Sequence, residues 1–226
     1  MTDLTTLTAL CPPPASVRSA PDWSQAENTL GTGLPEDYKQ LVATYGPGQF
    51  CGFLTLYQPH APSEWADLAG PMPERLRAQI EEVRQAARRP WPLPHPPENL
   101  LAMGVTGNSD YLFWATQPFD VPDEWTIAVN EALRAPWFTY NGTVTEFLVD
   151  VLSANVRVPM FPSDLLDGGI TFTPAELRST ATATASRTSV STHVIREWAR
   201  AKGFDLPERG RIPVEIMQAW EQANPR

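Results

Sequence analysis

The sequence predicts an α+β fold, on the strength of two amphipathic helical patterns and a series of short, aromatic-rich strands. Helical periodicity marks residues 34–45 and the segment that begins at Thr143, and strand-like segments lie between them. Hydrophobic residues make up 42% of the 226 residues and aromatic residues 10%, which is enough for a substantial core. The length leaves room for one domain of ordinary size and one small one.

The first third of the chain is expected to be mainly helical. Residues 1–21 contain three consecutive prolines and are predicted to be a loosely held lead-in with at most a short helix, and residues 23–30 are predicted to form a short helix. Pro35 suits the first turn of the next helix, and Gly46 is expected to end it. Its buried face is formed by residues at i, i+3, i+4 and i+7: Tyr38, Leu41, Val42 and Tyr45.

Strands are predicted in the middle of the chain. Residues 50–57 alternate and are rich in aromatic residues, so we expect one strand with Cys51 inside it as a small buried hydrophobe. Residues 71–88 form a polar helical pattern with an apolar stripe, and the five prolines of residues 90–97 require an extended loop. Further strands are expected at 100–105, 111–116, 125–130 and 137–140, with a turn at 107–110.

A second helix start follows the turn Asn141-Gly142. Thr143 and Glu146 fit the capping-box pattern, in which each side chain accepts a hydrogen bond from the other residue's backbone N–H. The helix that follows is expected to bury four apolar side chains: Phe147, Leu148, Val151 and Leu152.

This order of elements resembles the SUKH superfamily, the fold of Smi/Knr-type proteins and of many bacterial immunity proteins. The resemblance covers roughly residues 22–165. It implies a SUKH-like mixed sheet flanked by helices that binds other proteins, and family members often neutralise toxins. The residues that carry it are Leu34-Pro35, Asp37-Tyr38, Tyr45-Gly46, Gly48, Phe50, Leu54, Pro59, Gly107-Asn108, Asp110, Trp114, Trp125, Asn141-Gly142-Thr143 and Phe147-Leu148.

Composition and charge divide the chain. Residues 179–191 are low in complexity and lack large apolar side chains apart from Val190, so a flexible linker is predicted over 171–191. The formal net charge is −9. Residues 179–226 hold 7 basic and 5 acidic residues, whereas residues 1–178 hold 10 basic and 21 acidic ones. The predicted domains are therefore a lead-in (1–21), an acidic body (22–170), the linker and a mildly basic unit (192–226) that alone tolerates phosphate.

The basic unit is predicted to form two short helices on either side of the tripeptide Arg209-Gly210-Arg211. Apolar residues at helical spacing follow Val194, and a second helix opens at Pro213, so a small two-helix DNA-binding hairpin is predicted. Glycine lets a backbone lie close to the floor of a narrow groove, and the two arginines can extend along an A·T tract, where negative potential is concentrated. The alternative is a protein-docking hairpin in which Arg-Gly-Arg is a solvated turn.

This unit is similar to the DNA-binding domain of the bacterial histone-like xenogeneic silencers, the Lsr family. The residues that carry the similarity are Ile195 to Arg200, Gly203, Arg209 to Pro213 and the helix to Ala223-Asn224. The resemblance implies AT-hook-like minor-groove binding to A·T-rich DNA by Arg209, Gly210 and Arg211, with Arg196 as a possible phosphate contact. Physical reasoning adds Arg200 and Lys202 at the sides of the groove. The silencers' dimerising N-terminal domain is not matched, so DNA bridging does not carry over.

No catalytic or cofactor signature is found. His60, His95 and His193 lack a second ligand at metal spacing, and no histidine is placed to act as a base. We therefore expect a non-enzyme without cofactors or metals. Two cysteines and no secretory or membrane segment indicate a reducing cytoplasm, and DNA binding would make the protein nucleoid-associated.

Four acidic residues are a candidate protein-binding face. If the strands pair in sequence order, Asp110, Asp120, Asp123 and Glu124 are expected to share one rim of the sheet, where a basic partner such as a nuclease toxin would be attracted. The alternative is a set of solvated loops. Two functions result: a DNA-binding protein with a protein-interaction body, or an immunity protein whose tail docks to DNA or to a partner only incidentally.

Overall fold

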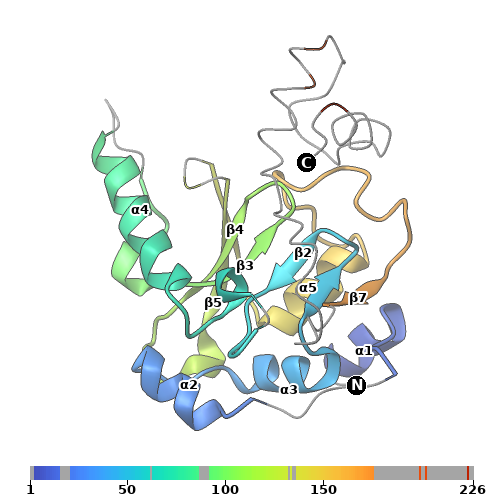
Figure 1. The fold of residues 1–226 in the computed structure, drawn as a ribbon, viewed down its shortest axis with the longest axis horizontal. Coiled ribbons are helices and arrows are strands. Elements are labelled where there is room, and N and C mark those ends of the chain that lie inside the picture. The colour runs from blue at the N-terminus through green and yellow to red at the C-terminus, as the bar shows by residue number, and fades with distance from the viewer. Residues whose placement is uncertain are drawn as a thin grey trace. The chain divides into compact units, whose positions relative to one another are not determined.

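In a computed structural model, the described residues are 3–15, 21–61, 63–86, 92–131, 133, 136–175, 199, 202 and 223. The α-helices are α1 (Asp3–Leu10), α2 (Trp23–Leu30), α3 (Glu36–Tyr45), α4 (Met72–Ala86) and α5 (Val144–Leu152), and three 3₁₀ turns are η1 (Glu64–Ala66), η2 (Pro97–Asn99) and η3 (Pro122–Glu124) (Figure 1). The strands are β1 (Gly48–Phe50), β2 (Leu54–Leu56), β3 (Leu100–Thr106), β4 (Tyr111–Ala115), β5 (Thr126–Asn130), β6 (Trp137–Tyr140) and β7 (Phe172–Pro174).

The strands form one antiparallel sheet in the order β6-β5-β4-β3-β2-β1-β7. From β1 to β6 each strand pairs with its neighbour in the sequence, so short connections build most of the sheet. The α+β class is confirmed. The sheet is antiparallel throughout, however, whereas the resemblance implied a mixed one.

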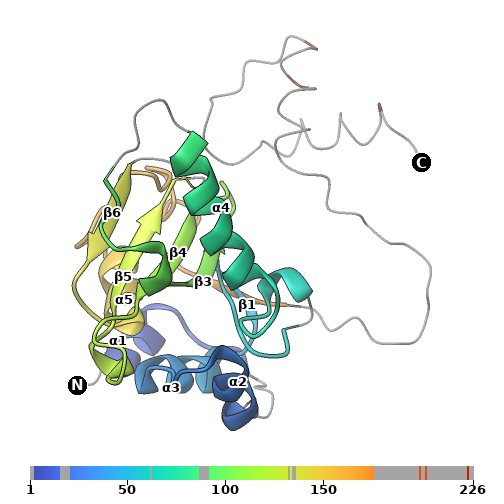
Figure 2. The ribbon, with the colours of Figure 1, turned by 90° about the vertical axis from the view of Figure 1, so that its left-hand side faces the viewer.

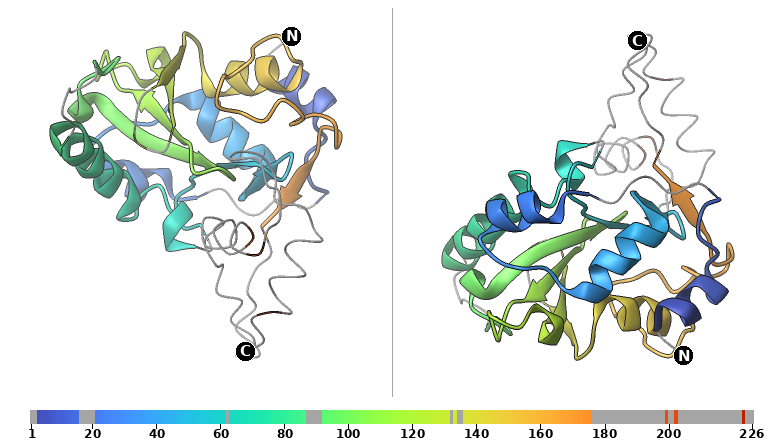
Figure 3. Two further views of the ribbon diagram at one scale, coloured as in Figure 1. Left: turned by 90° about the horizontal axis from the view of Figure 1, so that it is seen from above. Right: turned by 90° about the horizontal axis from the view of Figure 1, so that it is seen from below.

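Helices cover both faces of the sheet (Figures 2 and 3). On one face, the Tyr38 ring of α3 stands edge-on to Trp114 of β4, with ring centroids 4.9 Å apart, and Phe147 of α5 meets Tyr140 of β6 at 5.4 Å. On the other face, Phe113 lies beside Trp137, and α4 packs along β3 through its fully buried Leu76 and Ile80. Since both faces are covered, β3, β4 and β5 are almost completely buried.

Local sequence signals predicted the helices well. The four expected residues of α3 are all buried, Gly46 ends that helix, and α2 spans the predicted residues. At α5 the capping box is present: the Thr143 hydroxyl accepts from the Glu146 N–H, and the Glu146 carboxylate accepts from the Thr143 N–H at 2.7 Å. Each of these features depends on residues within a few positions of one another.

The lead-in contains the short helix that the sequence allowed, but the prediction that it is loosely held is wrong for its first part. Residues 3–10 form α1, whose Leu7 is fully buried, and Cys11 after it is buried as well. The Tyr45 hydroxyl donates to the Cys11 carbonyl at 2.6 Å, and α1 packs against α5. The N-terminal helix is therefore part of the core of the body.

The single strand predicted over 50–57 is two strands. Strands β1 and β2 pair through a tight turn in which Cys51 and Gly52 have φ of 52° and 60°. In this turn the Phe53 N–H donates to the Phe50 carbonyl. Positive φ at both central positions matches the turn that suits the twist of a hairpin. Cys51 is therefore a half-buried turn residue and not a buried strand residue.

Strand β7 lies inside the predicted linker and pairs with β1 at the edge of the sheet. Phe172 packs on Phe50 and Tyr45, with ring centroids 4.9 and 5.0 Å away. A side chain at Gly48 would collide with Phe172 and the Thr173 carbonyl, so the close pairing requires glycine there. Residues 172–174 thus belong to the sheet and not to a linker.

The chain divides into two compact units, residues 1–177 and 178–226. The predicted two-helix hairpin falls outside the described residues, except that Ala199 and Ala223 are helical and Lys202 lies in a turn. Within the described part of the chain, no helix is long and apolar enough to cross a membrane.

Candidate nucleic-acid and protein interfaces

Most of the predicted DNA-contacting residues lie outside the described residues: Arg196, Arg200, Arg209, Gly210 and Arg211. Lys202 is exposed, and its backbone N–H donates to the carbonyl of Ala199 at 3.1 Å. An exposed lysine just after a helical residue is compatible with the predicted place beside a groove.

Asp110, the first of the four predicted acidic residues, is a structural residue of the turn between β3 and β4. It is 3% exposed, and its carboxylate accepts from the Thr106 hydroxyl at 2.9 Å. The same hydroxyl oxygen accepts from the backbone N–H groups of Asn108 and Asp110. The Asp110 carboxylate therefore orients the hydroxyl that holds this turn closed.

The prediction that the four acidic residues share one rim is wrong for Asp110. In the pairing of β4 with β5, Tyr111 lies opposite Asn130 and Ala115 lies opposite Thr126. Asp110 lies immediately before the N-terminal end of β4, whereas residues 118–124 connect the C-terminal end of β4 to β5. The sequence-order pairing was right, but antiparallel strands place successive connections at opposite ends of the sheet.

The other three acidic residues lie on the connection between β4 and β5, which we call the 118–124 loop. Four hydrogen bonds hold this loop. The buried Trp125 indole N–H donates to the Pro118 carbonyl at 2.9 Å, and backbone N–H groups of Val121, Glu124 and Trp125 close successive turns onto carbonyls three residues earlier. The loop is thus fastened to the core by a tryptophan that itself packs on Trp114.

Asp123 also joins the loop to α3. Its carboxylate oxygen accepts from the Glu36 backbone N–H at 2.6 Å, although the two residues are 87 positions apart. The N-cap residue of α3 is Pro35, which has no side-chain acceptor, so Asp123 supplies the missing cap. One of the three loop carboxylates therefore has a structural partner.

Asp120 and Glu124 are exposed, and no ion pair involves them among the described residues. Beside them the loop exposes two apolar side chains, Phe119 at 49% and Val121 at 42%. These two residues were not predicted from the sequence, because the alternation of apolar and acidic residues after Pro118 does not distinguish an exposed apolar side chain from one that packs on the core.

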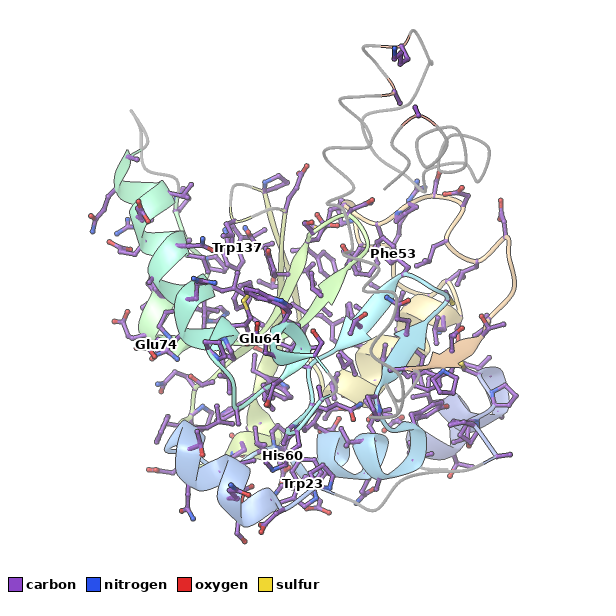
Figure 4. The ribbon with its side chains drawn as sticks, in the orientation of Figure 1. Trp23, Phe53, His60, Glu64, Glu74 and Trp137 are labelled. Atoms are coloured by element: carbon purple, nitrogen blue, oxygen red, sulfur yellow. The ribbon has the colours of Figure 1, made fainter. Side chains whose placement is uncertain are left out.

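The described cysteine and histidine side chains do not form a metal-binding cluster. Cys11 is buried, and burial first and then the neighbouring Cys51 raise the pKa of its thiol to about 11. His60 lies in the exposed loop after β2 (Figure 4), and burial lowers the pKa of His95. Among the residues that the structure describes, no group of three His, Cys, Asp or Glu side chains could hold a metal ion.

These features define a class: an acidic α+β domain built on a seven-stranded antiparallel sheet, followed by a separate, mildly basic unit. Residues 21–148 match the family model described as SMI1-KNR4 cell-wall, the sixth SUKH group. This match covers more than half of the chain, and the protein belongs to that family. Residues 187–223 match the Lsr2 DNA-binding domain, so the chain joins a SUKH module to a DNA-binding domain. No curated protein and no solved structure matches the chain.

Proposed function

We propose that the protein binds the minor groove of A·T-rich DNA through Arg209, Gly210 and Arg211, while its SUKH module binds a protein. The match of residues 187–223 to the Lsr2 DNA-binding domain carries this proposal, because the tripeptide lies inside the matched segment. Glycine between two arginines lets the backbone approach the groove floor while both guanidinium groups follow the groove.

The division of charge supports the same assignment. The body has an excess of 11 acidic residues, which repels phosphate, whereas residues 179–226 have an excess of 2 basic residues. Arg196, Arg200 and Lys202 add cations for the phosphates on either side of the groove. A few such contacts give a micromolar-order affinity that falls as salt is added, with a slope of about −0.9 per phosphate contact.

The proposed role requires no catalysis and places the protein with the bacterial nucleoid, in the cytoplasm. In the body, the buried Cys11 thiol stays protonated at neutral pH because its pKa is raised to about 11, which makes it a poor nucleophile. The protein would then act by bringing whatever its SUKH module binds to A·T-rich DNA.

A second candidate function rests on the resemblance of the body to SUKH immunity proteins. The body would neutralise a toxin, such as a basic nuclease, and the C-terminal unit would be a protein-docking module. The acidic balance of residues 1–178 favours a basic partner. In this case deletion of residues 179–226 leaves toxin binding intact.

The test is fluorescence anisotropy with A·T-rich and G·C-rich duplexes of equal length, titrated with the full chain over a salt series. The wild type is expected to prefer the A·T-rich duplex. Arg209→Ala combined with Arg211→Ala is expected to abolish that binding while the circular dichroism spectrum stays unchanged. The proposal fails if the double variant binds as tightly as the wild type.

A matched control removes the same charge from the body. Arg75 and Arg157 are both exposed, so Arg75→Ala combined with Arg157→Ala takes away two positive charges without touching the C-terminal unit. This variant is expected to bind A·T-rich DNA like the wild type. An equal loss in both double variants would show that net charge, and not the Arg-Gly-Arg motif, governs binding.

A further inference from the structure

We propose that the 118–124 loop is the surface through which the body captures a basic protein, with Phe119 and Val121 as apolar anchors and Asp120 and Glu124 as the charges that select the partner. This inference rests on the proposed protein-binding role of the SUKH module. The partner is expected to present arginine or lysine side chains around a shallow apolar pocket of its own, which receives the two anchors.

The two apolar side chains are exposed on a loop whose backbone is held in place. Trp125, Pro118 and the turn hydrogen bonds hold the backbone, and Asp123 fastens it to the N-terminus of α3. Pro122 also lies against the chain before α3, since a side chain added at Gly33 would touch its ring at 3.4 Å. Because the backbone of this loop is already held, the loop loses little conformational entropy when a partner binds, which favours affinity.

Phe119 and Val121 differ from the other large hydrophobic side chain that is exposed in the described part of the chain. Trp65 is 54% exposed, but the Arg75 guanidinium lies over its ring at 5.8 Å. Phe119 and Val121 have no such cation among the described residues. A phenylalanine and a β-branched residue exposed two positions apart on one loop supply apolar surface, and aromatic residues are enriched at the centres of interfaces.

The loop surface also carries negative charge. Asp120 lies between the two anchors in the sequence and Glu124 follows them, and Glu36 at the start of α3 adds a further exposed carboxylate next to Asp123. Each of the two ion pairs in the described residues lies elsewhere, between Lys39 and Glu27 and between Arg84 and Glu81. The carboxylates of Asp120 and Glu124 are thus available to cations, and the acidic body around them attracts a basic partner from a distance while it repels nucleic acid.

The experiment titrates the ¹⁵N-labelled full chain with three synthetic peptides and follows the backbone amide shifts. The first peptide is a threefold repeat of Arg-Leu-Arg-Gly, the second replaces each Leu with Ser, and the third replaces each Arg with Glu. The first peptide is expected to shift resonances centred on residues 118–124. The second is expected to bind more weakly there, and the third is expected to cause no shifts.

Variants separate the two parts of the surface. Phe119→Ser combined with Val121→Ser is expected to weaken binding of the Arg-Leu peptide about fivefold or more, the loss typical of a removed interface anchor. Asp120→Asn combined with Glu124→Gln is expected to weaken it and to flatten its salt dependence. Trp65→Ser is the matched control, because it removes an exposed aromatic side chain outside the loop, and it is expected to bind like the wild type.

The inference is overturned if the Arg-Leu peptide shifts resonances over the whole acidic body without a centre on the loop, or if the Phe119→Ser, Val121→Ser variant binds it as tightly as the wild type. DNA binding through Arg209 and Arg211 is measured separately and is unaffected by either result. If a toxin binds the wild type and the loop variants equally well, the protein-binding role of the body holds and the loop assignment fails.

Discussion

The two ends of strand β4 carry aspartates that look alike in the sequence and differ in what they do. Before the strand, Asp110 is buried and accepts a hydrogen bond from Thr106. After the strand, Asp120 is exposed between two exposed apolar side chains. A carboxylate whose partner lies inside the fold contributes to stability, whereas one that faces solvent costs little to replace and is available to a partner. The loss in the free energy of unfolding on replacing each acid should therefore depend on the partners that its carboxylate has inside the fold.

The largest effect is expected for Asp110→Ala. This change leaves the buried Thr106 hydroxyl proton without its acceptor and should lower the free energy of unfolding by about 2 kcal/mol. Urea denaturation followed by circular dichroism measures the loss. Ser109→Gly is the matched control in the same turn: Ser109 is exposed with φ of 66°, a value that glycine adopts without strain, so no loss is expected. A loss below 0.5 kcal/mol for Asp110→Ala, roughly the level of an ordinary surface change, would contradict the structural role.

Asp123→Ala is expected to have the second largest effect. It removes the acceptor for the Glu36 N–H at the start of α3, where Pro35 cannot replace it, and also a negative charge at the positive end of the helix dipole. The expected loss is about 1 kcal/mol, as for other N-cap removals. The Asp123→Asn variant keeps a side-chain oxygen and is expected to recover part of the stability. Equal losses in the two variants would mean that charge, not capping, is the main contribution.

The Glu27 carboxylate is partly exposed and paired with Lys39, and its contribution to stability is expected to depend on pH. Burial raises the pKa of its carboxyl, but the hydrogen bonds from Lys39 and from the Leu34 N–H outweigh it and leave the pKa below the ordinary value. A lowered pKa in the folded state means that the stabilisation is present above the ordinary pKa and is lost as the pH falls through the lowered one.

Glu27→Gln should therefore cost less than about 1 kcal/mol near pH 7, because the pair is partly exposed, and almost nothing near pH 3. Urea denaturation of the variant and the wild type at both pH values gives the difference. A gap that stays constant between the two pH values would show that the hydrogen bond from the Leu34 N–H, and not ionisation, provides the stability.

How well the sequence predicted these features depended on how far apart the interacting residues are. The α3 face and the Thr143–Glu146 capping box involve residues within one or two helical turns, so their spacing was sufficient. The hairpin turn was missed because Cys51 adopts a positive φ, which is unusual for cysteine. Strand β7 was missed because its three residues are specified by pairing with β1, more than 120 positions earlier.

The same reasoning explains the outcome at the candidate protein-binding surface. The sequence indicated which acids lie near turns, but not which end of the sheet each turn occupies. It also gave no sign that Asp123 caps α3, since α3 precedes it by most of the domain. Phe119 and Val121 were overlooked because an apolar residue in an acidic loop is recognised as exposed only when the hydrogen bonds that hold the loop are known.

The smallest effect on stability is expected for Asp120→Asn combined with Glu124→Gln. Neither carboxylate has an ion-pair or hydrogen-bond partner in the described part of the fold, and removing two like charges from an acidic surface relieves repulsion. The free energy of unfolding should therefore change by less than about 0.5 kcal/mol. The same variant should weaken binding of a basic peptide at the 118–124 loop.

Loss of binding without loss of stability distinguishes these two acids from Asp110. Asp110→Ala should lower the free energy of unfolding and leave peptide binding by the remaining folded protein intact. If the Asp120, Glu124 variant is instead as unstable as Asp110→Ala, the two ends of β4 do not differ in the way the hydrogen bonds indicate, and the loop carboxylates are structural.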